Sequence, residues 1–226
     1  MNDKKAIVLL SGGIDSATIL AMVCNEGYEV YTLSFWYGQK HFVELDFAQS
    51  LAKDYKVKKH MQVDLENLFI NFDTVSPLVA NGSVPTNRSL KEMQSDVAPT
   101  YTPGRNSIFL SIALSWAETL GAHHIFIGCN NGDYEGYPDC RPQFIEAFQH
   151  LANVATADNE VYYICAPLLE LTKPSIIRIG LDLGVDYDLT HSCYDPLGWE
   201  GGDCGECDAC IIRQKAFEEV RGGIHS

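Results

Sequence analysis

The chain has 226 residues, of which 46% are hydrophobic and 20% are charged. These proportions indicate a folded globular protein and exclude a disordered, collagen-like or coiled-coil chain. Sixteen basic residues against thirty acidic ones give a formal net charge of -14, which disfavours binding along an extended nucleic-acid backbone. The length suits one domain, or one domain with a small appendix.

The segment near the N-terminus contains no apolar run long enough for a signal peptide or a membrane span. The longest run, Ala6–Leu10, leads directly into a serine and two glycines. We therefore expect a cytoplasmic protein that does not associate with membranes. In such a protein the eight cysteines are expected to be reduced thiols, metal ligands or catalytic groups rather than disulfides.

Apolar runs alternate with amphipathic segments along the chain. Strands are predicted at residues 6–10, 29–35, 58–63, 124–129 and 162–166. Helices are predicted at residues 15–25, 41–55, 107–120, 142–155, from 174 to about 184, and from about 208 onward. This alternation predicts parallel strands with right-handed crossovers, and hence an open, doubly wound α/β sheet. Ligands of such sheets gather outside the carboxyl ends of the strands.

Residues 64–103 show weak periodicity and are rich in Asn, Ser, Thr and Pro. A loop of this length in a compact domain is usually functional, so we expect a lid or substrate loop over the site. We divide the chain into an α/β nucleotide-binding domain, residues 1–190, and a small metal-binding C-terminal segment, residues 191–226.

The sharpest motif is Ser11-Gly12-Gly13-Ile14-Asp15-Ser16, between the first strand and the first helix. Its glycines allow close backbone approach, and its N–H groups and the helix N-terminus attract anions. The motif predicts a pyrophosphate or triphosphate site, in which Mg²⁺ would separate Asp15 from phosphate. The alternative is a tight turn with Asp15 or Ser16 as N-cap. The pattern is neither a Walker loop nor a dinucleotide fingerprint.

Four cysteines near the C-terminus follow the spacing C-x10-C-x2-C-x2-C: Cys193, Cys204, Cys207 and Cys210. Four thiolates favour tetrahedral Zn²⁺ with no open position, and therefore a structural site. An iron–sulfur cluster is the main alternative, but the Cys-Pro that follows ferredoxin motifs is absent here. Unliganded thiols, or His191 in place of Cys193, are less favoured.

Three further motifs lie near predicted strand ends or helix starts, at residues 35–41, 102–106 and 133–141. They combine aromatic, amide, carboxylate and guanidinium groups, which can stack on a flat heterocycle and bind a carboxylate. Taken singly, each is also explained by a turn, a helix cap or a surface ion pair.

The glycine loop resembles the PP-loop of the ATP pyrophosphatases, which have the adenine nucleotide alpha hydrolase-like fold. The resemblance implies that ATP is split between its α and β phosphates, so that an acceptor oxygen is adenylated and becomes a good leaving group. AMP is then the expected product.

The motifs taken together, in their order along residues 6–215, resemble the 7-cyano-7-deazaguanine synthase family of queuosine biosynthesis. The resemblance implies ATP-dependent conversion of 7-carboxy-7-deazaguanine and ammonia to 7-cyano-7-deazaguanine, through carboxylate activation and an amide intermediate. It also implies a homodimer. Free ammonia is expected as the nitrogen source, because the chain has no room for a glutaminase domain.

On this resemblance we assign roles to individual residues. ATP is expected to contact Leu10, Ser11, Gly12, Gly13, Ile14, Asp15, Ser16, Ala17, Thr18, Ile19 and Leu20. The deazapurine is expected to contact Tyr37, Gln39, Arg105, Asn106, Asp133, Tyr137, Asp139 and Arg141. Asp15, Lys40 and Arg105 are expected to be catalytic, with Asp15 acting through Mg²⁺ and Lys40 stabilising charge on the departing pyrophosphate.

One segment departs from the family pattern. Residues 129–133, Cys-Asn-Asn-Gly-Asp, lie where many relatives have a cysteine followed by a glutamate, so no acid–base role is assigned there. Cys140 has no identifiable neighbouring base, and we interpret it as a buried thiol. Two other functions remain open: another PP-loop enzyme, such as a tRNA thiolase or an amidotransferase subunit, and a catalytically silent, zinc-stabilised nucleotide-binding protein.

Overall fold

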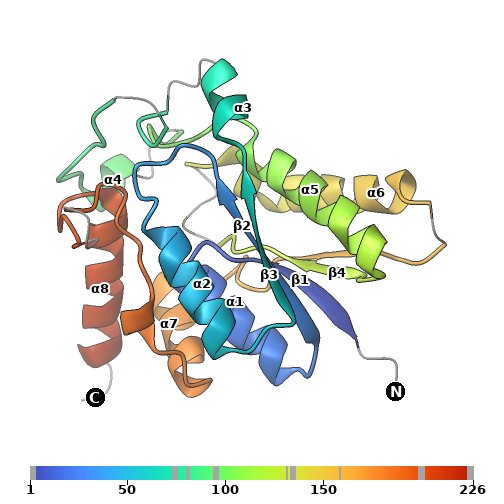
Figure 1. Ribbon diagram of the computed structural model, residues 1–226. Helices are drawn as coiled ribbons and strands as arrows, with labels where there is room; N and C mark the ends of the chain where they lie inside the picture. The colour runs from blue at the N-terminus through green and yellow to red at the C-terminus, as the bar shows by residue number, and fades with distance from the viewer. Residues whose placement is uncertain are drawn as a thin grey trace.

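A computed structural model describes residues 4–72, 76–79, 82–93, 97–130, 132, 136–157, 159–197 and 202–222. Among these residues, parallel strands form one five-stranded sheet in the order β3-β2-β1-β4-β5 (Figure 1). The strands are β1 (Lys5–Leu9), β2 (Glu29–Trp36), β3 (Lys59–Asp64), β4 (His124–Phe126) and β5 (Tyr163–Cys165). The predicted open α/β sheet is confirmed.

Helices cover both faces of the sheet (Figure 1). One face is covered by α1 (Ile14–Asn25), α2 (Glu44–Asp54), α7 (Lys173–Asp182) and α8 (Asp208–Gly222). The other is covered by α5 (Arg105–Leu120) and α6 (Pro142–Ala155). Alternate side chains of β1 supply the two cores, Val8 toward α1 and Ile7 toward α5, so the strand is apolar on both faces.

The observed elements differ most from the predicted ones at three places, and other boundaries are shifted by one or two residues. Helix α2 begins at Glu44, because residues 41–43 form tighter turns in which Glu44 N–H donates to His41 O at 3.0 Å. Strand β4 ends at Phe126, three residues early. The predicted loop 64–103 contains α3 (Glu66–Asn71) and α4 (Leu90–Met93), so it is partly helical.

The C-terminal residues pack on the main sheet. Ala216 and Val220 of α8 belong to the same core as α1 and α7. Tyr187, in the 3-10 turn η3 (Tyr187–Leu189), shares a buried 2.7 Å hydrogen bond with Thr18 of α1. The division of the chain at residue 190 stays a prediction. None of the helices in the described ranges is sufficiently long and apolar to cross a bilayer.

Candidate active site

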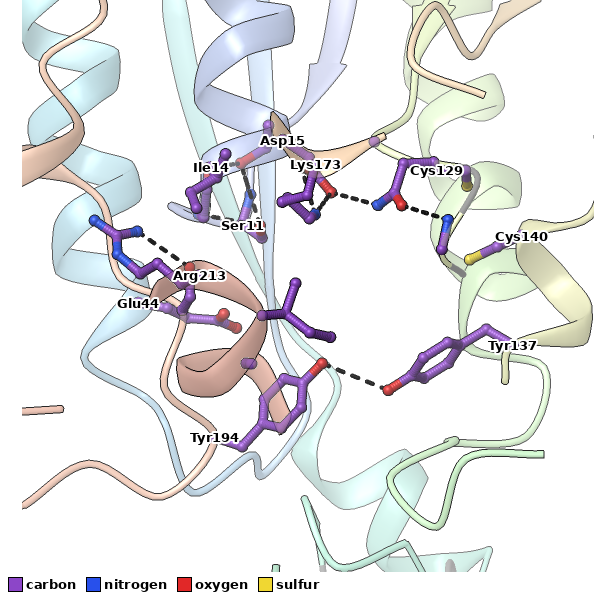
Figure 2. Close-up of a pocket in the computed structure, with 18 of the residues that line it drawn as sticks. Ser11, Ile14, Asp15, Glu44, Cys129, Tyr137, Cys140, Lys173, Tyr194 and Arg213 are labelled. Carbon is purple, nitrogen blue, oxygen red and sulfur yellow. Dashed lines mark hydrogen bonds and ion pairs between the residues drawn. The ribbon is translucent and has the colours of Figure 1, made fainter. Parts of the chain in front are cut away.

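A cavity of about 630 Å³ opens at the carboxyl ends of β1, β2 and β4 (Figure 2). The chain leaves β1 for α1 on one face of the sheet and leaves β4 for α6 on the other. The cavity therefore lies at the point where the winding reverses, which is where open α/β sheets bind ligands. Its volume is in the range of small-molecule sites.

The glycine loop forms one wall of this cavity. Ser11 and Ser16 face each other, with their hydroxyl oxygens 3.2 Å apart, and Gly13 N–H donates to Ser11 Oγ at 3.3 Å. Gly13 is the N-cap of α1 and makes no side-chain cap, so the amino end of the helix points toward the cavity. This arrangement of hydroxyl groups, N–H groups and helix terminus is suited to phosphate oxygens.

Gly12 holds the loop against α2 in a conformation that disfavours any side chain. Its φ is +87°, and a Cβ would lie 2.4 Å from the backbone oxygen of Glu44. We expect Gly12→Ala to destabilise the fold by about 3 kcal/mol or more and to abolish ATP binding, because both strain and overlap act there. Thermal unfolding and ATP titration measure the two effects.

Gly27→Ala is the matched control for this substitution. Gly27 has a similar φ of +79° but nothing within 4 Å of an added Cβ. It should cost about 1 kcal/mol through backbone strain alone and leave ATP binding unchanged. Equal losses for the two variants would show that the close approach of the loop to α2 is unimportant.

Asp15 is held by two neighbours at the loop's edge. Lys173 Nζ lies 2.7 Å from both carboxylate oxygens, and Asn130 Nδ2 donates to Oδ2 at 2.9 Å. Lys173 opens α7, after β5, and Asn130 follows β4, so three strand ends converge on one carboxylate (Figure 2). A carboxylate beside a phosphate loop is suitable donor chemistry for Mg²⁺.

Apart from Gly12, the residues assigned to ATP divide into two groups. Leu10, Ser11, Gly13, Ile14, Asp15 and Ser16 line the cavity. Ala17, Thr18, Ile19 and Leu20 are fully buried in α1 behind the loop, where they pack in the core or bond other residues. These four fix the position of the loop and present nothing to the cavity.

Arg213 of α8 lines the same cavity and joins α8 to the residues that precede the cysteines. Its guanidinium donates to Thr190 Oγ1 at 2.9 Å and to Tyr187 O at 2.7 Å. Next to it, His191 N–H donates to Gly12 O at 2.9 Å. The segment that carries the cysteines is thus bonded directly to the glycine loop.

Arg105 and Tyr37 form the opposite wall. Arg105 Nη1 donates to Tyr37 Oη at 3.0 Å, and the guanidinium carbon lies 5.5 Å from the ring centroid. Burial opposes the charge on Arg105, but neighbouring Tyr37 and Asp139 raise its pKa above the ordinary value. Burial also raises the pKa of Tyr37 to about 12. A protonated guanidinium beside neutral phenol is suited to a carboxylate or phosphate.

Asn106 and Asp139 bond to each other across the start of α5. Asn106 N–H donates to Asp139 Oδ2 at 3.0 Å, and its amide donates to Asp139 O at 3.0 Å. The same amide lies 3.3 Å from Cys140 Sγ. Asn106 and Cys140 line the cavity, whereas Asp139 is buried behind them. Asp139 therefore orients the wall.

Aromatic side chains close the cavity on a third side. The hydroxyl oxygens of Tyr137 and Tyr194 are 3.5 Å apart, and Tyr137 Oη is 2.7 Å from Thr100 Oγ1 (Figure 2). Both tyrosines line the cavity. Their rings provide flat surface on which a heterocycle could stack.

Three other assigned residues, Gln39, Lys40 and Arg141, do not line the cavity. Gln39 is 1% exposed, and its amide bonds to Tyr37 N, Phe35 O and Glu44 Oε1. Lys40 Nζ donates to Gly82 O, which attaches Gly82 to the residues that follow β2. Neither Lys40 nor exposed Arg141 is a lining residue, and their assigned roles stay predictions. Asp133 lies outside the described residues.

The four C-terminal cysteines converge. All of their Sγ atoms lie within 4.8 Å of one another, with Cys193–Cys207 and Cys204–Cys210 at 4.0 Å. Tetrahedral Zn²⁺ with bonds of about 2.3 Å needs sulfurs about 3.8 Å apart, so the set fits a zinc ion. Cys204 N–H donates to Cys193 Sγ and Cys207 N–H to Cys204 Sγ, as outer-shell donors do in metal sites.

Hydrogen bonds within the cluster shift the pKa values of these thiols. Hydrogen bonding with Cys207 raises the pKa of Cys193 to about 12, whereas bonds from Cys193 and Cys210 lower the pKa of Cys207. Sulfurs this close share protons, which a divalent cation would replace. His191 Nε2 instead contacts Cys193 O at 3.1 Å. The cluster is compatible with zinc held by four cysteines.

The sequence reasoning missed Glu44, Asn130, Lys173 and Arg213, all of which line the cavity. One signal was available for Lys173, because Thr172-Lys173-Pro174 opens a predicted helix after a predicted strand. Polar groups at such a position lie at the carboxyl edge of a parallel sheet. Arg213 lay within a helix attributed to the metal segment, and nothing in its local pattern points to the glycine loop.

The parallel sheet, the Ser-Gly-Gly loop after its central strand and the cavity at its switch point define an α/β protein of the PP-loop type. The model of the family described as "Queuosine biosynthesis protein QueC" matches residues 5–221, and the chain belongs to this family. The predicted family resemblance is confirmed.

Curated relatives match nearly the whole chain. The 7-cyano-7-deazaguanine synthase of Syntrophotalea carbinolica is 51% identical over 221 residues, covering 96% of this chain and 93% of the relative. The synthase of Desulfatibacillum aliphaticivorans is 49% identical over 221 residues, with the same coverages of 96% and 93%. That of Stutzerimonas stutzeri is 46% identical over 224 residues, covering 97% and 96%.

Solved structures support the fold at low sequence identity. The NMN synthetase from Francisella tularensis superimposes with a TM-score of 0.52 and 15% identity, covering 98% of this chain and 78% of that one. A predicted subunit of a tRNA methyltransferase from Methanocaldococcus jannaschii gives a TM-score of 0.50 and 13% identity, with coverages of 95% and 87%. These likenesses concern the fold alone.

Proposed function

We propose that this chain is an ATP-dependent 7-cyano-7-deazaguanine synthase, which converts 7-carboxy-7-deazaguanine and ammonia to the nitrile through an amide. The observation that carries the proposal is family membership over residues 5–221, in a chain whose curated relatives of similar length have that name. The cavity supports it, because a phosphate loop, a buried cation and stacking rings line one space.

The phosphates of ATP would lie on the wall made by the Ser11–Ser16 loop. Lys173 and Arg213 add two cations on that side, which would offset phosphate charge that a chain of net charge -14 otherwise repels. Asp15 would hold Mg²⁺ against the phosphates, which helps to neutralise the departing pyrophosphate. Lys40 is not a lining residue, so its assigned role would require its side chain to leave Gly82 O and reach the cavity.

The deazapurine would occupy the opposite side of the cavity. Tyr137 and Tyr194 offer stacking surface, Asn106 offers an amide, and Arg105 faces the position suited to a carboxylate. Adenylation of that carboxylate makes its oxygen a leaving group for ammonia. The amide oxygen can be activated in the same way at the same loop, so one ATP site serves both steps.

Four parts of this proposal extend beyond the cavity. Zn²⁺ on the four cysteines would be structural, since all four coordination positions are filled by thiolates. A homodimer with free ammonia as its nitrogen source, located in the cytoplasm, completes the proposed description.

Incubation of the purified protein with ATP, ammonium and 7-carboxy-7-deazaguanine tests the function. We expect mass spectrometry to show the nitrile, with one AMP and one pyrophosphate released in each of two steps. Omission of ammonium should stop product formation while leaving substrate-dependent pyrophosphate release in the first turnover. ATP turnover that does not depend on the deazapurine, with no nitrile, would contradict the proposal.

A further inference from the structure

Glu44 is the cavity carboxylate that pairs with no lysine or arginine among the described residues. Four carboxylates line the cavity there: Asp15, Glu44, Asp208 and Glu219. Asp15 pairs with Lys173 at 2.7 Å, Asp208 with Arg88 at 2.7 Å, and Glu219 with Arg178 at 3.9 Å. Glu44 instead contacts the Gln39 amide and the His41 ring, so no lysine or arginine holds its carboxyl group in the charged form.

The fold places Glu44 close to the phosphate loop. It is the first residue of α2, and its backbone oxygen packs against Gly12, closely enough that an added Cβ would overlap it. Its side chain is 14% exposed, and Figure 2 shows the carboxylate directed into the cavity on the side of Ser11 and Tyr194. A group at this position borders both the loop and the aromatic wall.

Each titratable group that faces Glu44 can be named. Gln39 Nε2 donates to Oε1 at 2.9 Å, and His41 Nε2 lies 3.4 Å from Oε2. Burial lowers the pKa of His41 to about 3, so this contact is with a neutral ring. Across the cavity Arg105 favours the carboxylate and Tyr37 is neutral. Burial outweighs these contacts and raises the pKa of Glu44 to about 7.

We propose that Glu44 is a catalytic residue that accepts protons from the substrate nitrogen in both halves of the reaction. This inference rests on the proposed function. Such a base must border both the adenylated carbon and the leaving phosphate, and Glu44 occupies the junction of these two walls. Proton acceptors are most effective when their pKa lies near the working pH.

The two proton transfers balance as follows. In the first half, ammonia forms a C–N bond to the acyl carbon, the C–O bond to AMP breaks, and the nitrogen gives one proton to Glu44. In the second half, the amide oxygen bonds the α phosphorus of ATP and pyrophosphate leaves, which gives an O-adenylated amide with two protons on nitrogen. The nitrogen loses one proton to water and gives the other to Glu44; the electrons of this last N–H bond form the third C–N bond, and AMP leaves with the C–O electrons. After each half the carboxyl group returns its proton to water.

Glu44→Gln tests this role, because it keeps the shape and the hydrogen bond from Gln39. We expect nitrile formation from the acid, and from the amide without ammonium, to fall at least about a hundredfold. ATP affinity and the first-turnover burst of pyrophosphate should stay within about threefold of the parent, because adenylation needs no proton from nitrogen. Rates within fivefold of the parent, or a lost burst, would overturn the proposal.

Asp46→Asn is the matched control. Asp46 lies one half-turn along α2, is exposed, and loses the same charge in this variant. Its rates should equal those of the parent, and a loss like that of Glu44→Gln would show a general charge effect. If the parent protein itself makes no nitrile, the proposed function fails, whereas a difference confined to Glu44→Gln concerns only this inference.

The pH dependence gives a second readout. For the parent, kcat should rise through about pH 7 as Glu44 loses its proton, and this limb should be absent from the residual activity of Glu44→Gln. The pH dependence of the folding stability has the opposite sign to that of kcat. A pKa raised on folding means that stability falls as pH rises from about 4.5 through about 7. Thermal unfolding of Glu44→Gln should lack that decline, and identical pH profiles would contradict ionisation of Glu44.

Discussion

Asp15→Asn should lower the turnover of ATP at least about a hundredfold while the fold and the cysteine cluster survive. Asp15 is the one residue in the described site on which Lys173, Asn130 and the glycine loop converge. The amide keeps the size of the carboxylate but loses its charge, so it can neither pair with Lys173 nor hold Mg²⁺ against phosphate. Initial rates at saturating ATP measure the loss.

Lys173→Met separates two explanations of that loss. If Asp15 serves only to position Lys173, the two single variants and the double variant should be equally slow. If Asp15 holds Mg²⁺, Asp15→Asn alone should weaken the dependence of the rate on Mg²⁺ concentration. Asp186→Asn, in a remote exposed cap where the carboxylate accepts only from Asp188 N, is the control for loss of charge. Near-normal turnover of Asp15→Asn would remove Asp15 from the mechanism.

The fold was predictable mainly because its central strands, β1 and β2, are covered on both faces of the sheet. Such strands read as short continuous apolar runs, and Ile7 and Val8 show why, since they enter opposite cores. The end of β4 was harder to predict. Residues 127–129 are as apolar as a strand, but they leave the sheet to line the cavity. Apolar pattern reports burial and does not distinguish a sheet from a buried loop.

The phosphate loop was predictable for a different reason, which is that its chemistry is local. Ser11, Gly13 and Asp15 are neighbours in sequence, so their spacing carries the signal. The same cavity is also lined by Glu44, Lys173 and Arg213, which belong to three different helices. More than a hundred residues of sequence separate Glu44 from the other two. Their convergence is a property of the tertiary fold, and short-range spacing does not contain it.

Some assigned residues do not line the cavity because their polar atoms make hydrogen bonds within the protein. Gln39 and Asp139 are polar, and their motifs suggested ligand contacts. In the structure their polar atoms bond main-chain and side-chain groups of the wall, as buried polar groups generally do. A motif therefore marks a site more reliably than it distinguishes residues that touch a ligand from residues that hold the wall.

Removal of a thiol from the cysteine cluster should have the largest effect on stability. The cysteine cluster packs with Leu78 and Val84, and Thr86 pairs with Cys207, so the cluster joins these three residues to the start of α8. We expect Cys207→Ser to lose zinc and at least about 3 kcal/mol of stability. For a chain of this size that corresponds to a fall in Tm of about 6–12 °C.

The same variant should also be inactive, because the segment it loosens supports the cavity. His191 N–H bonds Gly12 O, and Tyr194 and Arg213 line the cavity on either side of the cluster. Metal analysis, thermal unfolding and nitrile formation should therefore fail together in Cys207→Ser.

Cys24→Ser is the control, since Cys24 is a half-buried thiol of α1 outside the cluster. It should keep one zinc per chain and nearly normal activity. A brown protein with two or more irons per chain would replace zinc with an iron–sulfur cluster. Full activity and an unchanged Tm in metal-free Cys207→Ser would show that Leu78 and Val84 alone hold this wall, because the hydrophobic contacts would then suffice without a metal to fix the four sulfurs.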